Sequence, residues 1–188
     1  MRPSANITSI NLIITSFEIL GLCVLMILAL LIQFYLKEPP CPLCLLQRFG
    51  FMGIMLAVSL NLRFGYKANH TGLSLLFAIF TAFVALRQIA IHIVPGSGSY
   101  GSKILGLHLY TWSFVVSIAF IIFNCIVLCI ENLPINKEVS NKTQNKTYIA
   151  LFFIVGTIIL INLVSTFFEC GLGSCPENPV TYMIATYF

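Results

Sequence analysis

Two cysteines separated by two residues, Cys41 and Cys44, lie between two long apolar stretches of the sequence. A Cys-x-x-Cys pair can cycle between dithiol and disulfide, and its reactive form is the thiolate. Pro39 and Pro40 precede the pair, and proline is well tolerated in the first turn of a helix. We therefore expect Cys44 at or near a helix start, where unpaired N–H groups favour an anion.

Arg48 follows Cys44 by four residues, which places the two side chains on the same face of a helix. Its guanidinium can stabilise a Cys44 thiolate or a negative charge on an acceptor beside it. A simple loop disulfide or half of a metal site is the alternative for a bare Cys-x-x-Cys pair. The helix start, the edge of an apolar stretch and the arginine together favour exchange with a lipid-soluble substance.

A second pair, Cys170 and Cys175, follows the last apolar stretch. Gly171 and Gly173 give the intervening backbone freedom to turn, so the two cysteines can close a small disulfide loop. An exposed short loop of this kind exchanges readily with other thiols instead of bracing a fold. The segment is predicted to be a second redox-active pair.

The composition is that of an integral membrane protein, because 59% of the 188 residues are hydrophobic and only 9% are charged. A helix needs about 20 apolar residues to cross a bilayer. Five stretches are long enough: residues 10–36, 45–62, 73–94, 108–130 and 148–168. We expect an all-α membrane bundle of five transmembrane spans, a four-helix core plus one extra helix, as a single domain over residues 1–188 with an outer tail from residue 169. The net charge of +4 is scattered over loops and indicates no nucleic-acid partner.

The basic residues predict the orientation in the membrane. If the N-terminus is cytoplasmic, six basic residues lie inside and three outside, as the positive-inside rule favours. The inner residues are Arg2, Arg63, Lys67, Lys137, Lys142 and Lys146, and the outer ones are Lys37, Arg48 and Lys103. An odd number of spans puts the C-terminus outside. Both cysteine pairs then share an outer compartment, where disulfides persist.

Polar side chains align at one depth, in the outer third of the predicted spans. Convergent polar groups inside an apolar bundle are typical of a pocket for an amphipathic ligand with hydrogen-bonding carbonyls. The group comprises Gln33, Arg48, Arg87, Gln88, His92, His108, Tyr110 and Trp112. Tyr110 and Trp112 can instead belong to the interfacial aromatic belt, and His92 can be solvated at the boundary. Glu18, within the first span, either has a functional role or is a neutral acid bonded to a neighbouring helix.

Several of these residues also form a family pattern. Gln33 lies eight residues before the Cys-x-x-Cys pair and Arg48 four residues after it. The Ala85-Leu-Arg87 segment comes late in the third span, and Leu105-Gly-Leu-x-x-x-x-Trp112 opens the fourth. Over roughly residues 10–131 the sequence thereby resembles the disulfide-bond-formation protein B family, DsbB.

The resemblance implies a quinone-dependent thiol-disulfide oxidoreductase in the bacterial inner membrane. Cys41 and Cys44 would pass electrons to bound ubiquinone or menaquinone, with Cys44 nearest the quinone and Arg48 supporting the charged complex. Gln33, Arg87 and His92 are expected to bind the quinone with them. A second outer pair would exchange with a DsbA-like periplasmic oxidase of the thioredoxin fold.

The second pair departs from the family pattern. In the family it lies in a long loop between the third and fourth spans, and four spans are usual. Here that loop, residues 95–107, contains no cysteine, and a fifth span follows. We expect Cys170 and Cys175 to take over the exchange role. Two alternatives from other classes stay open: a four-thiolate zinc site built from the outer cysteines, and a structural membrane subunit with inert disulfides. The quinone type, the client and the direction of electron flow also stay open.

Overall fold

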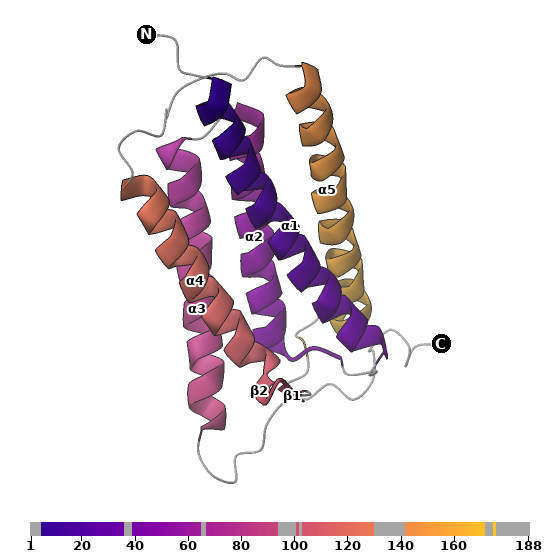
Figure 1. The fold of residues 1–188 in the computed structure, drawn as a ribbon. Coiled ribbons are helices and arrows are strands. Elements are labelled where there is room, and N and C mark those ends of the chain that lie inside the picture. The colour runs from indigo at the N-terminus through magenta and orange to yellow at the C-terminus, as the bar shows by residue number, and fades with distance from the viewer. Residues whose placement is uncertain are drawn as a thin grey trace.

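Five long helices cross the molecule in the part of the chain that the structure describes (Figure 1). A computed structural model describes residues 5–35, 39–64, 67–93, 101, 103–129, 142–171 and 175, with the backbone alone for residues 5–12 and 142–147. The helices are α1 (Ala5–Tyr35), α2 (Pro42–Phe64), α3 (Ala68–His92), α4 (Leu109–Cys129) and α5 (Lys142–Cys170). Each contains a span of 21 to 25 residues that is apolar enough to cross a membrane. The predicted all-α membrane bundle of five spans is confirmed.

The helices lie side by side, and the start of α1 and the end of α5 are at opposite ends of the bundle (Figure 1). The start of α2, the two short strands and the end of α5 share one end, which we call the cysteine end. There β1 (Lys103–Ile104) pairs antiparallel with β2 (Leu107–His108). This hairpin was not predicted from the sequence. Leu105 and Gly106 form its turn with φ of 52° and 83°, and two positive φ values are typical of a two-residue hairpin turn.

Helices α2 and α3 pack closely because α2 has glycines where it meets α3. A Cβ atom added to Gly50 would collide with the Thr81 hydroxyl, and one added to Gly53 would collide with the Phe77 ring. Small residues of this kind let two helix backbones approach in a membrane. The contact sets the register in which α2 presents its first turn to the last turn of α3.

Helices α1 and α4 are joined by a polar contact away from the cysteine end. Asn124 in α4 donates a hydrogen bond of 2.8 Å from Nδ2 to Oε1 of Glu18 in α1, and both side chains are buried. Of the two interpretations of Glu18, the structure agrees with an acid bonded to a neighbouring helix. Such bonds between membrane helices contribute about 0.6 kcal/mol on average.

Helix α5 is part of the bundle core, since it packs against both α1 and α2. Its Val155 and Ile158 belong to the same buried apolar cluster as Met26 and Phe51. Near the cysteine end its Ser165 accepts a 2.8 Å hydrogen bond from Nε2 of Gln33 in α1. The extra helix therefore reaches the region that contains the cysteines.

Candidate active site

Cys41 forms the N-terminal cap of α2. Its carbonyl accepts the first helical hydrogen bond, from the Leu45 N–H at 3.0 Å, and its sulfur accepts the Cys44 N–H at 3.2 Å. An N-cap side chain usually accepts this N–H through oxygen, so sulfur takes the place of a serine hydroxyl here. Pro42 occupies the first helical position, where its missing N–H costs nothing. Helix α2 thus begins at Pro42, three residues before the expected span, and the Cys-x-x-Cys pair lies within its first turn.

The amide group of Gln88, in the last turns of α3, lies against both sulfurs. Its Nε2 is 3.2 Å from Sγ of Cys41 and 3.5 Å from Sγ of Cys44. Its Oε1 accepts a 2.7 Å hydrogen bond from Nε2 of Gln47 in α2. Both glutamines are buried. The two sulfurs, one amide N–H₂ group and the start of α2 therefore form a single buried polar cluster.

The two thiols of the pair do not hold their protons equally. A hydrogen bond with the Cys44 sulfur, burial and the negative charge of a Cys44 thiolate raise the pKa of the Cys41 thiol. Cys41 therefore keeps its proton, and the negative charge of a singly ionised pair resides on Cys44. This is the thiol that the sequence predicted to be reactive.

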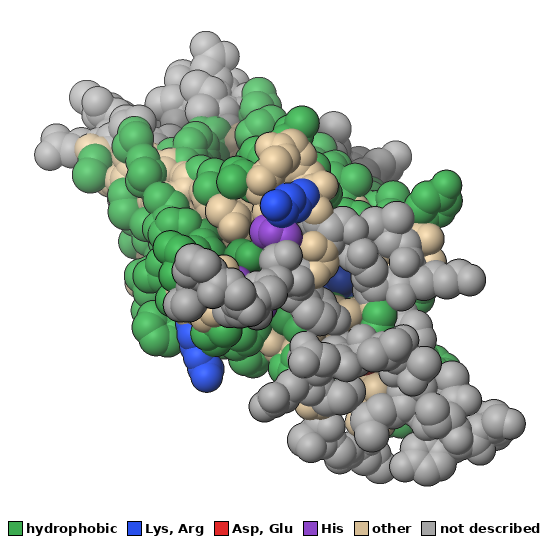
Figure 2. Space-filling view, turned by 90° about the horizontal axis from the view of Figure 1, so that it is seen from below, with side chains coloured by type: hydrophobic (Ala, Val, Ile, Leu, Met, Phe, Trp, Pro, Cys, Tyr) green, Lys and Arg blue, Asp and Glu red, His purple; other side chains and the backbone are tan. Residues whose placement is uncertain are grey.

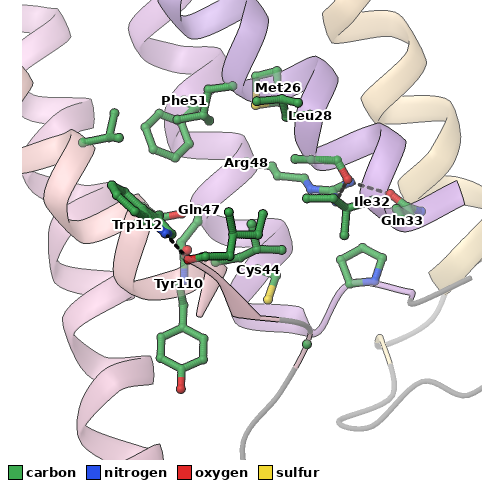
Figure 3. Close-up of a pocket in the computed structure, with 18 of the residues that line it drawn as sticks. Met26, Leu28, Ile32, Gln33, Cys44, Gln47, Arg48, Phe51, Tyr110 and Trp112 are labelled. Atoms are coloured by element: carbon green, nitrogen blue, oxygen red, sulfur yellow. Dashed lines mark hydrogen bonds between the residues drawn. The ribbon is translucent and has the colours of Figure 1, made fainter. Parts of the chain in front are cut away.

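Arg48 is held by hydrogen bonds to α1 (Figure 3). Its Nη1 donates to Oε1 of Gln33 at 2.6 Å, and its Nη2 donates to the carbonyl oxygen of Ala29 at 3.1 Å. Gln33 in turn donates to Ser165 in α5. The chain of contacts from α2 through α1 to α5 fixes a positive charge one turn beyond Cys44.

A cavity of about 340 Å³ opens beside this arginine. Cys44, Gln47, Arg48 and Phe51 of α2 form one wall, whereas Cys41 is not part of the lining. The other walls come from α1, from α4 and from the hairpin, and nearly all of their side chains are apolar. Figure 3 shows the cavity with Met26, Leu28, Ile32 and Gln33 on the α1 side and Tyr110 and Trp112 on the α4 side.

Aromatic side chains fix the hairpin at the mouth of this cavity. Trp112 Nε1 donates a 2.9 Å hydrogen bond to the carbonyl oxygen of Ile104. The ring of Tyr110 stacks on that of His108, with centroids 5.2 Å apart and planes 5° from parallel. Leu105, in the strained left-handed turn position, also lines the cavity. The motif that opens the fourth span thus builds one wall of the site.

Two residues expected to bind a ligand lie outside the cavity wall. Arg87 is exposed, because successive residues of a helix point about 100° apart and its neighbour Gln88 faces inward. His92 is half-buried, with Nδ1 2.9 Å from the carbonyl oxygen of Gln88. Its ring centroid is 5.5 Å from that of Tyr110, so His92 contacts the wall from behind. Gln33, Cys44 and Arg48 are brought together as lining residues.

The second pair is closed as a disulfide between Cys170 and Cys175, with Cα atoms 4.6 Å apart. Cys170, the last residue of α5, is buried. Glu169 before it is 1% exposed, and neither carboxyl oxygen has a hydrogen-bond partner in the described part of the chain. Among the described residues, no group of three or more His, Cys, Asp or Glu side chains is placed to hold a metal ion.

Four contributors to the site were not predicted as such from the sequence: Gln47, Gln88, Ser165 and Glu169. Gln88 belongs to the aligned polar group, but alignment in depth does not say which atoms it contacts. Gln47 could have been singled out as a polar residue one turn after Cys44. Ser165 and Glu169 are spaced four residues apart at the end of the fifth span and so share a helix face.

Part of the chain matches a known protein family. Residues 13–101 match the family model described as disulfide bond formation protein DsbB. No curated protein and no solved structure matches the chain. The matched region includes the Cys-x-x-Cys pair, Gln33, Arg48 and Gln88, while the Cys170–Cys175 disulfide lies beyond it. The chain therefore belongs to the DsbB family and is a multi-pass membrane protein of disulfide-bond formation, a thiol-disulfide oxidoreductase.

Proposed function

We propose that this protein reoxidises a thioredoxin-like thiol oxidase and passes the electrons to a membrane quinone held beside Cys44. One observation carries the proposal. The ionisable thiol of the Cys-x-x-Cys pair and a fixed guanidinium group share the wall of a mostly apolar cavity. A purely structural disulfide needs neither the cavity nor the charge.

The lining residues fit a quinone. Ligand cavities are typically about 300–1,000 Å³, mostly apolar, with a few polar groups that fix orientation. Arg48 and Gln47 offer N–H groups to a ring carbonyl at the cysteine end. The wall continues along α1 from Gln33 to Gly21, a rise of about 18 Å. An apolar groove of this length suits an isoprenoid tail.

The roles of the chain's own residues follow from their positions. A bound quinone supplies the acceptor for two electrons and two protons. Cys44 faces it with the ionised sulfur, and Arg48 stabilises the negative charge that develops on an acceptor there. Cys41, behind Cys44 and retaining its proton, is the thiol that then closes the disulfide with Cys44. Gln33 keeps the guanidinium directed along the wall.

The Cys170–Cys175 pair is proposed to receive electrons from the partner. A partner thiolate attacks this disulfide, and the dithiol that results reduces the Cys41–Cys44 disulfide by a second exchange. Two observations support the sequence of events. Both pairs lie at the cysteine end of the bundle, and the Arg48–Gln33–Ser165 contacts connect α5 to the Cys44 wall.

The cysteine end is proposed to face the periplasm of a bacterial inner membrane, with the N-terminus in the cytoplasm. Arg63 and Lys67 at the opposite end agree with the positive-inside rule. Figure 2 views the molecule from the cysteine end, where described hydrophobic side chains surround a few basic ones and histidine.

Quinone reduction by purified protein tests the proposal, with a reduced thioredoxin-like oxidase as electron donor. Wild type is compared with Cys44→Ser, with Cys170→Ser/Cys175→Ser and with Cys125→Ser, a control on the exposed face of α4. Loss in the first two variants, with activity in the control, supports the relay. Loss in Cys44→Ser alone would show that the tail pair does not receive the electrons. No turnover of ubiquinone or menaquinone by wild type would overturn the proposal.

A further inference from the structure

The contacts of Gln88 suit a change of charge on the cysteine pair. A primary amide has two N–H donors, and the Gln88 Nε2 lies within hydrogen-bond range of both sulfurs, at 3.2 Å and 3.5 Å. Gln88 is fully buried, so water does not supply this interaction. A thiolate accepts an N–H hydrogen bond far more strongly than a disulfide sulfur does. The same amide therefore interacts more strongly with the reduced pair than with the oxidised one.

The orientation of this amide is fixed by a second glutamine. Gln47 donates to Oε1 of Gln88 at 2.7 Å, which leaves Nε2 of Gln88 facing the sulfurs. The Gln88 Oε1 is also 3.8 Å from Sγ of Cys44, at the limit for a thiol donor. The close packing of Gly50 against Thr81 sets the α2–α3 register in which the two glutamines meet.

We propose that Gln88 is a catalytic hydrogen-bond donor to the reduced Cys41–Cys44 pair and that Gln47 is the positioning residue that orients its amide. The inference rests on the thiol-disulfide chemistry of the pair and needs neither the quinone nor the tail pair.

The Gln88 amide acts during thiol-disulfide exchange, in which a dithiol donates electrons to the pair. A thiolate of an incoming dithiol bonds to the Cys41 sulfur, the Cys41–Cys44 bond breaks, and Cys44 leaves with the electron pair as a thiolate. The second thiol of the donor, after losing its proton, displaces Cys41 and closes the donor's own disulfide, and the Cys41 sulfur takes up that proton. Gln88 Nε2 donates to the sulfur that carries the charge. Two electrons and one proton thus pass from the donor dithiol to the pair, and the negative charge of the attacking thiolate ends on Cys44.

The equilibrium between the pair and a dithiol buffer measures this effect. Wild type is incubated with mixtures of reduced and oxidised dithiothreitol, quenched with an alkylating reagent, and Cys41 and Cys44 are scored by mass spectrometry. We expect Gln88→Met to shift the equilibrium about tenfold towards the disulfide, which corresponds to about 30 mV. Gln47→Met should shift it in the same direction by less, because the Gln88 amide remains but can rotate.

Asn162→Leu is the matched control, because it removes another buried amide, whose Nδ2 donates within α5 to the Ile158 carbonyl in the described part of the chain. Its equilibrium should equal that of wild type. An unchanged equilibrium in folded Gln88→Met, or a shift of equal size in Asn162→Leu, would overturn the inference. If Gln88→Met does not fold, the dithiol–disulfide equilibrium of Gln47→Met is the test. An unchanged equilibrium in that variant would overturn the inference. The assay contains no quinone. Its result therefore does not depend on whether the wild-type protein reduces quinone.

Discussion

The two cysteine pairs lie at the same end of the bundle, but their surroundings differ. Cys41 and Cys44 sit in the first turn of α2, with a backbone N–H and the Gln88 amide directed at their sulfurs. Cys170 and Cys175 form a disulfide at the end of α5, and no N–H group in the described part of the chain is directed at their sulfurs. N–H donors stabilise a thiolate.

The difference assigns a direction to the two pairs. The surroundings of Cys41 and Cys44 favour the reduced, charged state and open onto an apolar cavity. The described surroundings of Cys170 and Cys175 lack such N–H donors, so by comparison this pair favours the closed disulfide. A pair that favours the disulfide gives up electrons readily to one that favours the dithiol. Electrons are therefore expected to run from the tail pair to the pair beside the cavity.

Removing the charge of Arg48 should have the largest effect on that direction. We expect Arg48→Met to reduce the rate of quinone reduction about 100-fold to 1,000-fold, because the developing negative charge loses its cation. Exchange between the two cysteine pairs should be affected far less, since it needs no cation for a developing charge and the Gln33–Ser165 contact remains. Arg63→Met, at the opposite end of α2, is the control. Equal losses in the two arginine variants would contradict a role specific to the cavity.

Filling the cavity should impair quinone binding beside Cys44, a step in which the Cys170–Cys175 pair takes no part. Ser113→Trp places a large side chain in the wall, and we expect the KM for quinone to rise about tenfold or more as the ligand loses its space. Val115→Trp, on the same helix but 44% exposed, should leave KM unchanged. Steady-state kinetics at several quinone concentrations distinguish the two, and a KM unchanged in Ser113→Trp would place the acceptor elsewhere.

The unequal thiols within the first pair predict an order of chemical modification. The raised pKa of Cys41 keeps that thiol protonated at neutral pH, so a thiolate-selective alkylating reagent should label Cys44 severalfold faster. The rate at Cys41 should increase only as the pH rises towards its raised pKa. Time-resolved mass spectrometry of the reduced protein measures both rates. Faster labelling of Cys41 at neutral pH would contradict the assignment of Cys44 as the thiol that carries the negative charge.

The smallest effect is expected where α5 meets α1. Ser165→Ala removes the acceptor for Gln33, and we expect a loss of about 0.6 kcal/mol in the free energy of unfolding together with slower exchange between the pairs. Thr157→Ala is the matched control, since among the described residues its hydroxyl bonds to the Phe153 carbonyl on the exposed face of α5. Unfolding in denaturant and alkylation kinetics report the two quantities. If the two pairs exchange in Ser165→Ala at the wild-type rate, this contact does not align the pairs.

Much of the fold could be predicted because membrane spans are long apolar stretches, and the five helices follow from them. The site was predictable where local spacing controls geometry. Cys41 and Cys44 lie three residues apart at the start of one helix. Arg48 comes four residues after Cys44, on the same face. The hairpin was missed because its turn depends on Leu105 in a left-handed conformation that the residue type disfavours.

Contacts between helices could not be predicted from the sequence. The choice between Arg87 and Gln88 as the inward residue depends on the rotation of α3, which is set by packing against Gly50 and Gly53. The meeting of Gln33 with Ser165 joins residues 132 positions apart. Polar residues at one depth indicate a site, but the rotation of each helix decides which of them face it.

The most direct test of the proposed electron path is a single turnover. Fully reduced protein, with all four outer cysteines as thiols, is mixed with one equivalent of quinone and quenched with an alkylating reagent at successive times. Mass spectrometry then identifies which disulfide forms first. We predict that Cys41–Cys44 closes before Cys170–Cys175, because only Cys44 among these cysteines lines the cavity in the described structure. Earlier closure of Cys170–Cys175 would contradict the account.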